Sequence, residues 1–381
     1  MLKKQVLSLL MVAVILLSSG TISAYALGED EITAPSAVLM EPVTGKVLFE
    51  KNSHEVRPCA SITKVMTLIL VFEAVESGVL DYTDMITSSA HAASMGGSDI
   101  WLEEGEQMTV DHMIKAVVVA SANDAAVALA EAICGTEEEF VNKMNEKAAA
   151  LGMKDTTFKN CNGLDEDGHL TSAYDVALMS AELITHEKIF DYSSIWIDYL
   201  RGGETQIVNT NKLLKSYKGI TGLKTGTTSQ AGSCMSATAT RENMSLVAVV
   251  LGCDTGTNRF SDCAKLLDFG FANYMVKELS IRGGSLTPVK VKSGMKPIVC
   301  VKCNIEKQAL LPKSSNKEIE TKIDIAEEIE APVKAGTKVG KVSFVYEGAT
   351  VDEFDILASE NVEKITFGSV FSFLMGKLFE F

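Results

Sequence analysis

The stretch SITKVMTLILVFEAVES, residues 61–77, joins a polar pair to a long apolar run. Apolar side chains fill nearly every position from Val65 to Phe72, and Gly78 follows the stretch directly. A helix that is apolar almost all round is a buried one, so we predict a central helix that ends at Gly78. Ser61 and Lys64 stand three residues apart at its start, which places a hydroxyl and an amine on one helix face.

Ser61 and Lys64 are candidates for a nucleophile and its base. A serine hydroxyl becomes nucleophilic when an unprotonated amine lies beside it. Burial disfavours an ammonium, and so does the positive potential at the start of a helix, so both effects favour a neutral Lys64. The pattern S-x-x-K is nevertheless common by chance, and a helix N-cap with a solvated lysine explains it better when it is seen alone. The rest of the chain must decide between the two interpretations.

The segments on either side of this helix indicate a sheet and further helices. Two short strands around a turn at Pro42 and Gly45 are typical of a hairpin, within residues 34–50. Helical spacing follows in three segments, residues 109–120, 124–133 and 137–151. Strand patterns then occupy residues 221–225, 233–240 and 245–253, and helical spacing returns at 262–276. We therefore predict an antiparallel sheet combined with a helical cluster.

The C-terminal part of the chain has a different pattern. Gly283 and Gly284 suggest a linker, after which short Val/Ile-rich runs alternate with Pro/Gly turns and acidic stretches. This pattern predicts a small all-β domain over residues 279–363. In residues 364–381, Phe367, Val370, Phe371, Leu374, Leu378 and Phe381 recur at spacings of three and four. The tail is therefore predicted to be an amphipathic helix that lies on a membrane surface, although packing on the β domain is an alternative.

The N-terminus has the three parts of a secretory signal peptide. Lys3 and Lys4 precede an apolar run of residues 6–17, and small residues end at Ala24-Tyr25-Ala26. The apolar run is shorter than the roughly 20 residues that a membrane-spanning helix needs. We therefore expect cleavage after Ala26, which leaves residues 27–278 as the larger domain and places the protein outside the cytoplasm.

Composition and charge exclude several classes of protein. The chain has 381 residues, of which 46% are hydrophobic and 22% charged, which is the composition of a folded protein large enough for two domains. Its net charge of −15 argues against a nucleic-acid partner. The eight cysteines form no compact disulfide framework. Cys300 and Cys303 resemble half of a zinc site, but they have no second pair and are interpreted as ordinary strand residues.

The sequence also lacks the signatures of several common enzyme classes. It contains no H-E-x-x-H, no G-x-S-x-G, no G-x-G-x-x-G and no P-loop pattern. It has only five histidines. A zincin, an α/β-hydrolase and a dinucleotide-binding enzyme are therefore not expected, and a catalytic base other than histidine is favoured.

Two further polar motifs follow the first. Ser121-Ala122-Asn123 lies between two predicted helices, where a hydroxyl and an amide could relay protons and hold a substrate amide, although helix capping is an equal alternative. Lys224-Thr225-Gly226 ends a strand and presents a cation, a hydroxyl and a glycine, which suits an extended peptide with a carboxylate. Its alternative is a polar strand end before a turn. Together and in this order, the three motifs are the signature of penicillin-binding proteins and class A β-lactamases.

The surroundings of these motifs resemble the D-alanyl-D-alanine carboxypeptidases, the low-molecular-mass penicillin-binding proteins. The similar stretches are residues 60–67, 120–130, 222–228 and 265–271, together with 162–165 and 171–175 near the expected active site. The resemblance is close over residues 34–278 and concerns only the architecture beyond them. It implies an α/β catalytic domain of the β-lactamase/transpeptidase-like type, followed by the small β domain and the C-terminal helix.

The resemblance implies a role for each motif residue. Ser61 would attack the carbonyl of the penultimate D-Ala of a peptidoglycan stem pentapeptide, with Lys64 as base and Ser121 as the group that passes the proton to the leaving amine. The substrate-binding residues implied are Asn123, Lys224, Thr225, Gly226, Thr227 and Arg259. The backbone N–H groups of Ser61 and Thr227 would hold the oxyanion. No metal and no cofactor are implied, and β-lactam antibiotics would act as covalent inhibitors.

Other functions share these motifs. A class A β-lactamase would not normally carry a C-terminal β domain and an apolar tail. A non-hydrolytic penicillin sensor or wall-binding protein remains an alternative, and a transpeptidase or an endopeptidase would differ only in its acceptor or substrate. The expected place of action is the outer face of the cytoplasmic membrane or the cell-wall space of a bacterium.

Overall fold

The computed structural model describes residues 26–281, 286–305, 307–313 and 317–378. The predicted signal peptide falls almost entirely on residues 1–25, and the Gly283-Gly284 linker on residues 282–285, so both lie outside the described residues. The chain divides into two compact units, one that ends at Asn273 and one that begins at Tyr274. Each unit has its own hydrophobic core.

The first unit is built on a five-stranded antiparallel sheet with the strand order β2-β1-β9-β8-β7. Its strands are β1 (Ser36–Glu41), β2 (Lys46–Lys51), β7 (Ile220–Thr228), β8 (Gly232–Arg241) and β9 (Met244–Cys253). The first and last parts of the unit therefore meet in one sheet, and the intervening segment forms the helical cluster. The predicted β1–β2 and β8–β9 hairpins are confirmed, and Glu242 and Asn243 take the positive φ values of a tight hairpin turn.

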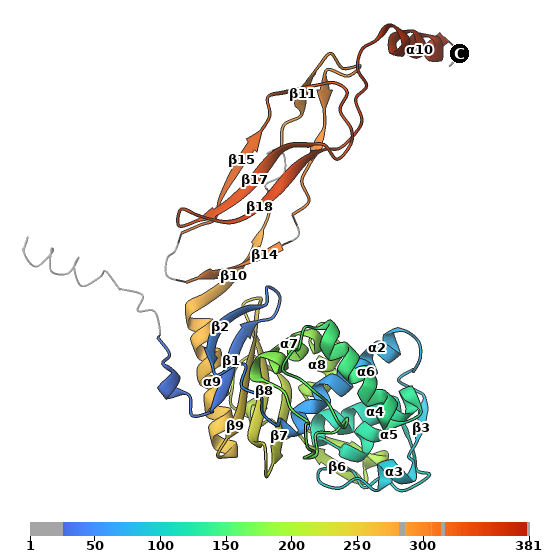
Figure 1. Cartoon of the computed structure of the whole chain (residues 1–381), viewed down its shortest axis with the longest axis vertical. Helices are drawn as coiled ribbons and strands as arrows, with labels where there is room; N and C mark the ends of the chain where they lie inside the picture. Colours follow the sequence, from blue (N-terminus) through green and yellow to red (C-terminus); the bar gives the residue numbers. More distant parts are fainter. Residues whose placement is uncertain (1–25, 282–285, 306, 314–316, 379–381) are drawn as a thin grey trace, which may run out of the picture. The chain divides into compact units, whose positions relative to one another are not determined.

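Both faces of this sheet are covered, as Figure 1 shows. The helix α9 (Gly256–Asn273) packs against β1, β8 and β9, and α7 (Ala173–Leu183) also packs against these strands. Successive β9 residues divide between the two faces: Val247, Val249 and Leu251 join the core shared with the helical cluster. Leu246 lies near α9, because a Cβ on Gly270 would meet its side chain at 2.5 Å. A strand buried on both sides explains the continuous apolar run of β9.

The helical cluster supplies the middle of the chain. Its helices are α2 (Lys64–Glu76), α3 (Ala90–Ala93), α4 (Val110–Lys115), α5 (Asn123–Cys134), α6 (Glu137–Ala150) and α8 (Ile189–Ser193). Two irregular turns accompany them, the 3₁₀ turn η2 (Ala60–Thr63) and the π turn η3 (Ala116–Ala120). Short hairpins complete the unit, β3 (Met85–Thr87) with β4 (Gln107–Thr109) and β5 (Ile197–Leu200) with β6 (Thr205–Val208). The predicted central helix is confirmed as α2, with every residue from Lys64 to Phe72 buried.

The predicted helix over residues 262–276 is wrong at both ends. The helix α9 begins at Gly256, where the Thr255 hydroxyl accepts a hydrogen bond from the Asn258 N–H at 3.1 Å. It stops at Asn273, and the next six residues form the strand β10 (Tyr274–Leu279). The strand pairs with β14 (Lys307–Pro312), so a partner that is distant in the sequence overrides the local helical spacing.

In its described residues, the second unit is all-β apart from its last helix. A four-stranded sheet has the order β13-β18-β17-β15, and a three-stranded sheet has the order β12-β11-β16. The bounds are β11 (Val289–Lys292), β12 (Ile298–Val299), β13 (Val301–Lys302), β15 (Glu320–Ile325), β16 (Glu328–Glu330), β17 (Lys338–Tyr346) and β18 (Ala349–Ala358). The predicted fold class, a catalytic α/β domain followed by a small β-rich domain and a final helix, is confirmed.

The chain ends in the helix α10 (Phe367–Leu378). Phe367, Phe371 and Leu378 on this helix are 88%, 55% and 69% exposed. Within the described residues, no helix combines the length and the hydropathy that crossing a membrane requires.

Candidate active site

Ser61 lies on a tight turn between a strained residue and a buried helix. Ala60 has a φ of +52°, a conformation that costs a residue with a side chain about 1 kcal/mol or more. Ser61 belongs to the 3₁₀ turn η2, and Lys64 is the first residue of α2. The Lys64 Nζ lies 3.0 Å from the Ser61 Oγ. The predicted contact between hydroxyl and amine is thus present, made by the turn that leads into the helix.

Lys64 is fully buried and is held by two acceptors besides Ser61. Its Nζ donates to the Asn123 Oδ1 at 2.5 Å and to the backbone carbonyl oxygen of Asn162, also at 2.5 Å. Burial lowers the pKa of Lys64 from 10.5 to about 7, although Cys161 and Asp124 oppose the shift. A substantial fraction of the side chain is therefore a neutral amine at neutral pH.

These two acceptors also fix the direction of the Lys64 lone pair. A neutral amine has two N–H bonds and one lone pair, whereas an amide oxygen and a backbone carbonyl can only accept. When Asn123 and Asn162 take the two N–H bonds, the lone pair is left for the hydroxyl proton of Ser61. The geometry is that of a general base beside its nucleophile.

Ser121 and Asn123 come from the break between η3 and α5. Ser121 has φ and ψ of 63° and 29°, the left-handed conformation that ends the π turn. Asn123 begins α5, and its Nδ2 donates to the Gly96 carbonyl at 2.6 Å while its Oδ1 accepts from Lys64. The N-cap residue of α5 is Ala122, which makes no side-chain capping bond, and the Asn123 side chain is bound to Gly96 and Lys64 instead.

Lys224, Thr225 and Gly226 lie on β7 at the edge of the five-stranded sheet. The Lys224 Nζ donates to the Ser121 Oγ at 2.8 Å, which joins the second and third motifs. The Thr225 hydroxyl donates to the Thr210 Oγ1 at 2.6 Å. Burial lowers the pKa of Lys224 well below its ordinary value, and the nearby charges of Lys64 and Arg259 lower it further.

Gly226 lets the strand come close to Ser61. A Cβ at this position would lie 2.7 Å from the Cys59 carbonyl oxygen and 3.0 Å from the Ser61 nitrogen. Arg259, from α9, donates to the Gly226 carbonyl at 2.9 Å and to the Thr227 Oγ1 at 2.8 Å. The structure thus connects all nine of the predicted site residues through direct contacts or adjacent positions in one region of the first unit.

Several residues that hold this site have no motif of their own. The Asn162 carbonyl contacts Lys64 through the backbone, so its side-chain type gives no signal. Asp124 is buried, and its carboxylate accepts from the Ile100 and Leu102 N–H groups at 3.0 Å. Gly163 has a φ of +86°, and a Cβ there would lie 2.0 Å from the Ala60 carbonyl oxygen. The resemblance of residues 162–165 to a segment near the family's active site was the one signal that could have found this loop.

A separate group has the composition of a cation site. Glu73, Glu182 and His186 bring their ligand atoms within 4.8 Å of one another, the one such group among the described residues. The Lys147 Nζ lies 2.6 Å from a carboxylate oxygen of both Glu73 and Glu182. The lysine thus supplies the countercharge that a metal ion would bring. All eight cysteines, including Cys300 and Cys303, are free thiols.

Comparison with known proteins agrees with this geometry. Residues 23–255 match the family model described as D-alanyl-D-alanine carboxypeptidase, and residues 274–364 match the penicillin-binding protein 5 C-terminal domain. The D-alanyl-D-alanine carboxypeptidase DacF of Bacillus subtilis is 41% identical, with 98% of each chain covered.

Solved structures extend the likeness to three dimensions. Penicillin-binding protein 5 of Haemophilus influenzae superposes with a TM-score of 0.77 at 30% identity, covering 89% of this chain and all of the other. Penicillin-binding protein D2 of Listeria monocytogenes, in its ampicillin-bound form, has a TM-score of 0.58 at 33% identity and covers 63% of this chain and 98% of the other. The chain belongs to the D-alanyl-D-alanine carboxypeptidase family and is a serine-type D-Ala-D-Ala carboxypeptidase, one of the low-molecular-mass penicillin-binding proteins.

Proposed function

We propose that this enzyme removes the terminal D-Ala of peptidoglycan stem pentapeptides through an acyl-enzyme on Ser61. The observation that carries the proposal is the 3.0 Å contact between the Ser61 Oγ and the buried Lys64 Nζ, whose pKa is lowered to about 7. A base with a pKa near the working pH combines a large neutral fraction with useful proton affinity.

Acylation transfers one proton, forms one C–O bond and breaks one C–N bond. The Ser61 Oγ gives its proton to the Lys64 Nζ and bonds to the carbonyl carbon of the penultimate D-Ala. The C–N bond to the terminal D-Ala then breaks, and the leaving nitrogen receives the proton through Ser121. Lys64 is then neutral again and takes a proton from the water that attacks the acyl carbon. That proton returns to the Ser61 Oγ as the ester bond breaks.

The remaining site residues bind the substrate and the developing charge. The backbone N–H groups of Ser61 and Thr227 hold the oxyanion, and the close approach of Gly226 to the Ser61 nitrogen supports this placement. Lys224, Thr225 and Arg259 receive the terminal carboxylate. The charges of Lys64 and Arg259 both disfavour the protonated form of Lys224, and an anionic carboxylate offsets this repulsion.

Covalent labelling with a fluorescent penicillin tests the nucleophile. We expect one labelled site in the wild-type enzyme and none in Ser61→Ala. Cys59 is the neighbouring alternative, but burial raises the pKa of its thiol to about 12, so the reactive thiolate is scarce. Labelling of Ser61→Ala at the wild-type level would refute the assignment.

Release of D-Ala from a peptide ending in D-Ala-D-Ala tests the reaction itself. A carboxypeptidase releases it catalytically, whereas a non-hydrolytic sensor stops after one acylation. A β-lactamase instead turns over penicillin faster than it hydrolyses the peptide. Absence of catalytic release from the purified full-length enzyme, with labelling intact, would contradict the proposal.

The proposal extends to domain organisation and location. The boundary predicted at residue 278 is moved to Asn273, where the first compact unit ends. Residues 1–26 act as an export signal, residues 27–273 form the catalytic domain, residues 274–363 form the β domain and residues 364–381 anchor the enzyme. The substrate class supports export, since relatives of this chain are D-alanyl-D-alanine carboxypeptidases and peptidoglycan lies outside the cytoplasm. The N-terminal sequence of the protein recovered from the producing cell tests cleavage after Ala26.

The tail is proposed to lie on the outer face of the cytoplasmic membrane. Phe371, Phe373 and Leu374 on α10 are between 54% and 56% exposed, and Phe367 is 88% exposed. Such a concentration of exposed apolar side chains on one short helix favours an apolar partner, and a helix of this length suits the interface better than a span. If a variant that ends at Glu363 sediments with membranes as well as the full chain does, the tail is not the anchor.

A further inference from the structure

The loop of residues 160–163 supplies a backbone carbonyl to the base of the reaction. The Asn162 carbonyl oxygen accepts from the Lys64 Nζ at 2.5 Å. A carbonyl on a loop holds a direction only as firmly as the neighbouring peptide groups are held. The groups that fix this loop therefore influence where the Lys64 lone pair points.

The peptide groups of Cys161 are held on both sides. Its carbonyl oxygen accepts from the Thr67 Oγ1 at 2.5 Å, and Thr67 is buried on α2 one turn after Lys64. Its N–H donates to the Glu137 Oε1 at 3.0 Å. Two different helices, α2 and α6, thus fix the residue that directly precedes the Asn162 carbonyl.

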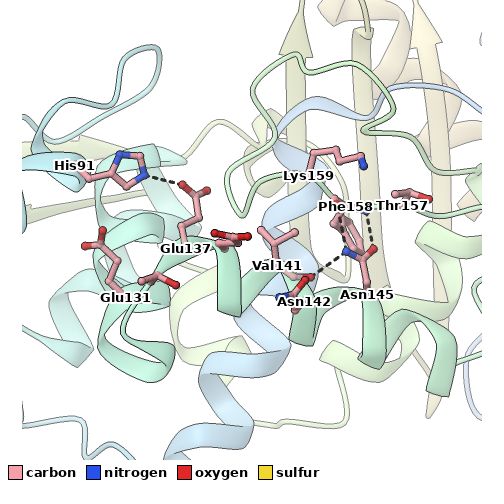
Figure 2. A pocket seen from close by; sticks show the side chains of 11 residues that line it. His91, Glu131, Glu137, Val141, Asn142, Asn145, Thr157, Phe158 and Lys159 are labelled. Atoms are coloured by element: carbon pink, nitrogen blue, oxygen red, sulfur yellow. Dashed lines mark hydrogen bonds and ion pairs between the residues drawn. The ribbon is translucent and has the colours of Figure 1, made fainter.

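Glu137 uses its second carboxylate oxygen for a different partner. The Glu137 Oε2 lies 2.8 Å from the His91 Nε2. Figure 2 shows this pair at the rim of a pocket, which Glu131, Glu138 and Lys159 also line. The Glu137 side chain is 15% exposed and the His91 side chain 51% exposed, so the carboxylate points inward and the imidazole faces solvent.

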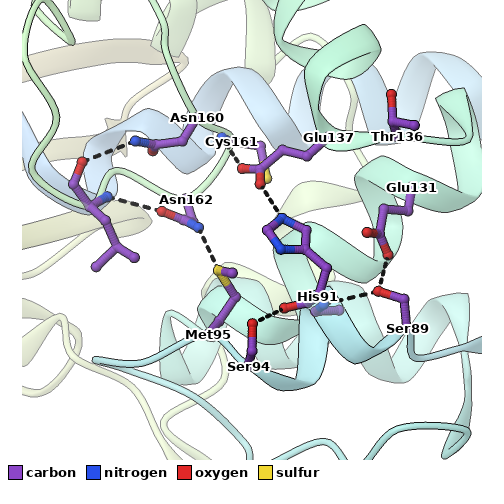
Figure 3. A network of polar contacts seen from close by, with 12 residues as sticks. Ser89, His91, Ser94, Met95, Glu131, Thr136, Glu137, Asn160, Cys161 and Asn162 are labelled. Carbon is purple, nitrogen blue, oxygen red and sulfur yellow. Dashed lines mark hydrogen bonds and ion pairs between the residues drawn. The ribbon is translucent and has the colours of Figure 1, made fainter.

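The contacts form a continuous path, which Figure 3 draws from His91 through Glu137 to the backbone of Cys161 and on to Asn162. Glu137 is the first residue of α6, where Thr136 caps the helix through the Glu139 N–H. The cap fixes the backbone of Glu137, and the two hydrogen bonds fix its carboxylate. Glu137 is therefore a rigid link between the surface and the loop that contacts Lys64.

We propose that Glu137 is a positioning residue for the Lys64 base. It holds the Cys161 peptide so that the Asn162 carbonyl takes one N–H bond of Lys64 and leaves the lone pair directed at Ser61. The inference rests on the proposed role of Lys64. Glu137 itself contacts neither Ser61 nor the substrate in this scheme, so its loss changes the rate of the chemical step and leaves substrate affinity nearly unchanged.

Acylation kinetics with a chromogenic β-lactam test the proposal. The full-length enzyme is mixed with increasing concentrations of the β-lactam, which separates the saturating acylation rate from the half-saturating concentration. For Glu137→Ala we expect the saturating rate to fall about tenfold, since small displacements of a catalytic group cost rates of this order or more. The half-saturating concentration should stay within about twofold of the wild-type value.

Two further variants separate positioning from charge. In Glu137→Gln the amide oxygen still accepts from the Cys161 N–H, and the amide nitrogen can donate to a neutral His91, so most of the saturating rate should return. Glu138→Ala is the matched control, because Glu138 is an exposed acid in the same first turn of α6. It removes the same favourable interaction with the helix N-terminus and should acylate as the wild type does.

Each outcome decides the matter. A Glu137→Ala enzyme with the wild-type saturating rate overturns the proposal, and so does a Gln variant as slow as the Ala variant. If Glu137→Ala does not fold, Thr67→Val releases the other side of Cys161 while preserving the side-chain shape, and it must also lower the saturating rate. Lys64→Met is measured in parallel. If Lys64→Met is acylated at the wild-type rate, Lys64 is not the base and the proposed function fails. If Lys64→Met is not acylated but Glu137→Ala has the wild-type saturating rate, only the positioning role of Glu137 is removed.

Discussion

Lys64 is a buried amine whose two fixed neighbours can only accept hydrogen bonds. The Asn123 Oδ1 and the Asn162 carbonyl oxygen both lie 2.5 Å from its Nζ. Burial lowers the pKa of this side chain from 10.5 to about 7. Burial thus makes the protonated form of Lys64 unfavourable in the folded state, so the proposed role as a base and the stability of the fold are coupled at this residue.

The lowered pKa of Lys64 makes the free energy of unfolding depend on pH. Between about pH 7 and 10.5 the unfolded chain binds a proton on Lys64 that the folded chain has lost, so the free energy of unfolding rises with pH in this window. The contribution is at most about 1.4 kcal/mol per pH unit. Urea unfolding of the wild type and of Lys64→Met measures it, because the titrating groups that Lys64 does not influence cancel in the difference. Equal pH slopes for both proteins would contradict the lowered pKa.

Ser121 combines a strained backbone with the hydroxyl that we propose as the proton relay. Its φ of 63° lies in the left-handed region, and its Oγ accepts from Lys224 at 2.8 Å. This conformation has an unfavourable free energy for a residue with a side chain, whereas glycine adopts it freely. This backbone conformation directs the hydroxyl toward Lys224 and into the site. It lowers the stability of the protein, and the contacts of the surrounding structure maintain it.

The second prediction compares two ways to remove that hydroxyl. Ser121→Ala and Ser121→Gly should both release D-Ala about a hundredfold more slowly, since both lack the proposed proton relay. The Gly variant should be more stable than the Ala variant by about 1 kcal/mol, because it relieves the strain. Release assays and thermal melts check both parts. An Ala variant as stable as the Gly variant would show that no strain resides at Ser121.

At the level of elements, the site depends on how closely β7 approaches the 3₁₀ turn η2. The strand is at the sheet edge, and its Gly226 faces the backbone of Cys59 and Ser61. Backbone atoms cannot rotate away as a side chain can, so the distance between the two elements is set by the absence of a Cβ. The oxyanion site proposed between Ser61 and Thr227 requires this closeness.

The third prediction follows from that approach. Gly226→Ala places a Cβ 2.7 Å from the Cys59 carbonyl oxygen, so β7 must move and the acylation rate should fall about a hundredfold. Gly45→Ala is the control: its φ is +70° and nothing lies within 4 Å of the added Cβ, so it costs about 1 kcal/mol of stability but no activity. A Gly226→Ala enzyme that is acylated at the normal rate would remove the role assigned to this close contact.

At the level of the whole molecule, the chain consists of two units with separate cores. The cluster of buried apolar residues shared with the helices lies within residues 38–251 of the first unit, and that of the second unit lies within residues 279–362. All nine predicted site residues belong to the first unit. The Listeria protein D2 has 98% of its length matched to only 63% of this chain, and its solved form carries ampicillin. The solved, ampicillin-bound chain of that relative is therefore matched by about as many residues as the first unit contains.

The fourth prediction tests the independence of the first unit. A variant limited to residues 27–273 should fold and be acylated by penicillin within about threefold of the full-length rate, since no residue of the site is removed. Circular dichroism and penicillin labelling measure the two properties. A folded but unlabelled variant would show that the second unit contributes to the active site.

The hairpin strands, the buried helix α2 and the glycine-ended helices α5 and α6 were predictable because each is set by a local pattern. The three motifs were predictable as a set, since their order along the chain is a signature. The end of α9 was not, because residues 274–276 pair with β14, a partner that local spacing does not contain. The 3₁₀ and π turns that carry Ser61 and precede Ser121 were also missed, since they depend on how neighbouring elements pack.

The sequence by itself determined the family and the two-part organisation of the chain, and it singled out Ser61 and Lys64 as the proposed nucleophile and base. The tertiary structure alone decided how these two side chains are arranged. The lowered pKa of Lys64 comes from burial among elements distant in the sequence, and its lone pair is directed by the Asn123 amide and the Asn162 backbone carbonyl. Every residue has a backbone carbonyl, so the residue type does not reveal which carbonyl contacts Lys64. Its position, and the role of Glu137 in holding it, therefore follow only from the folded arrangement.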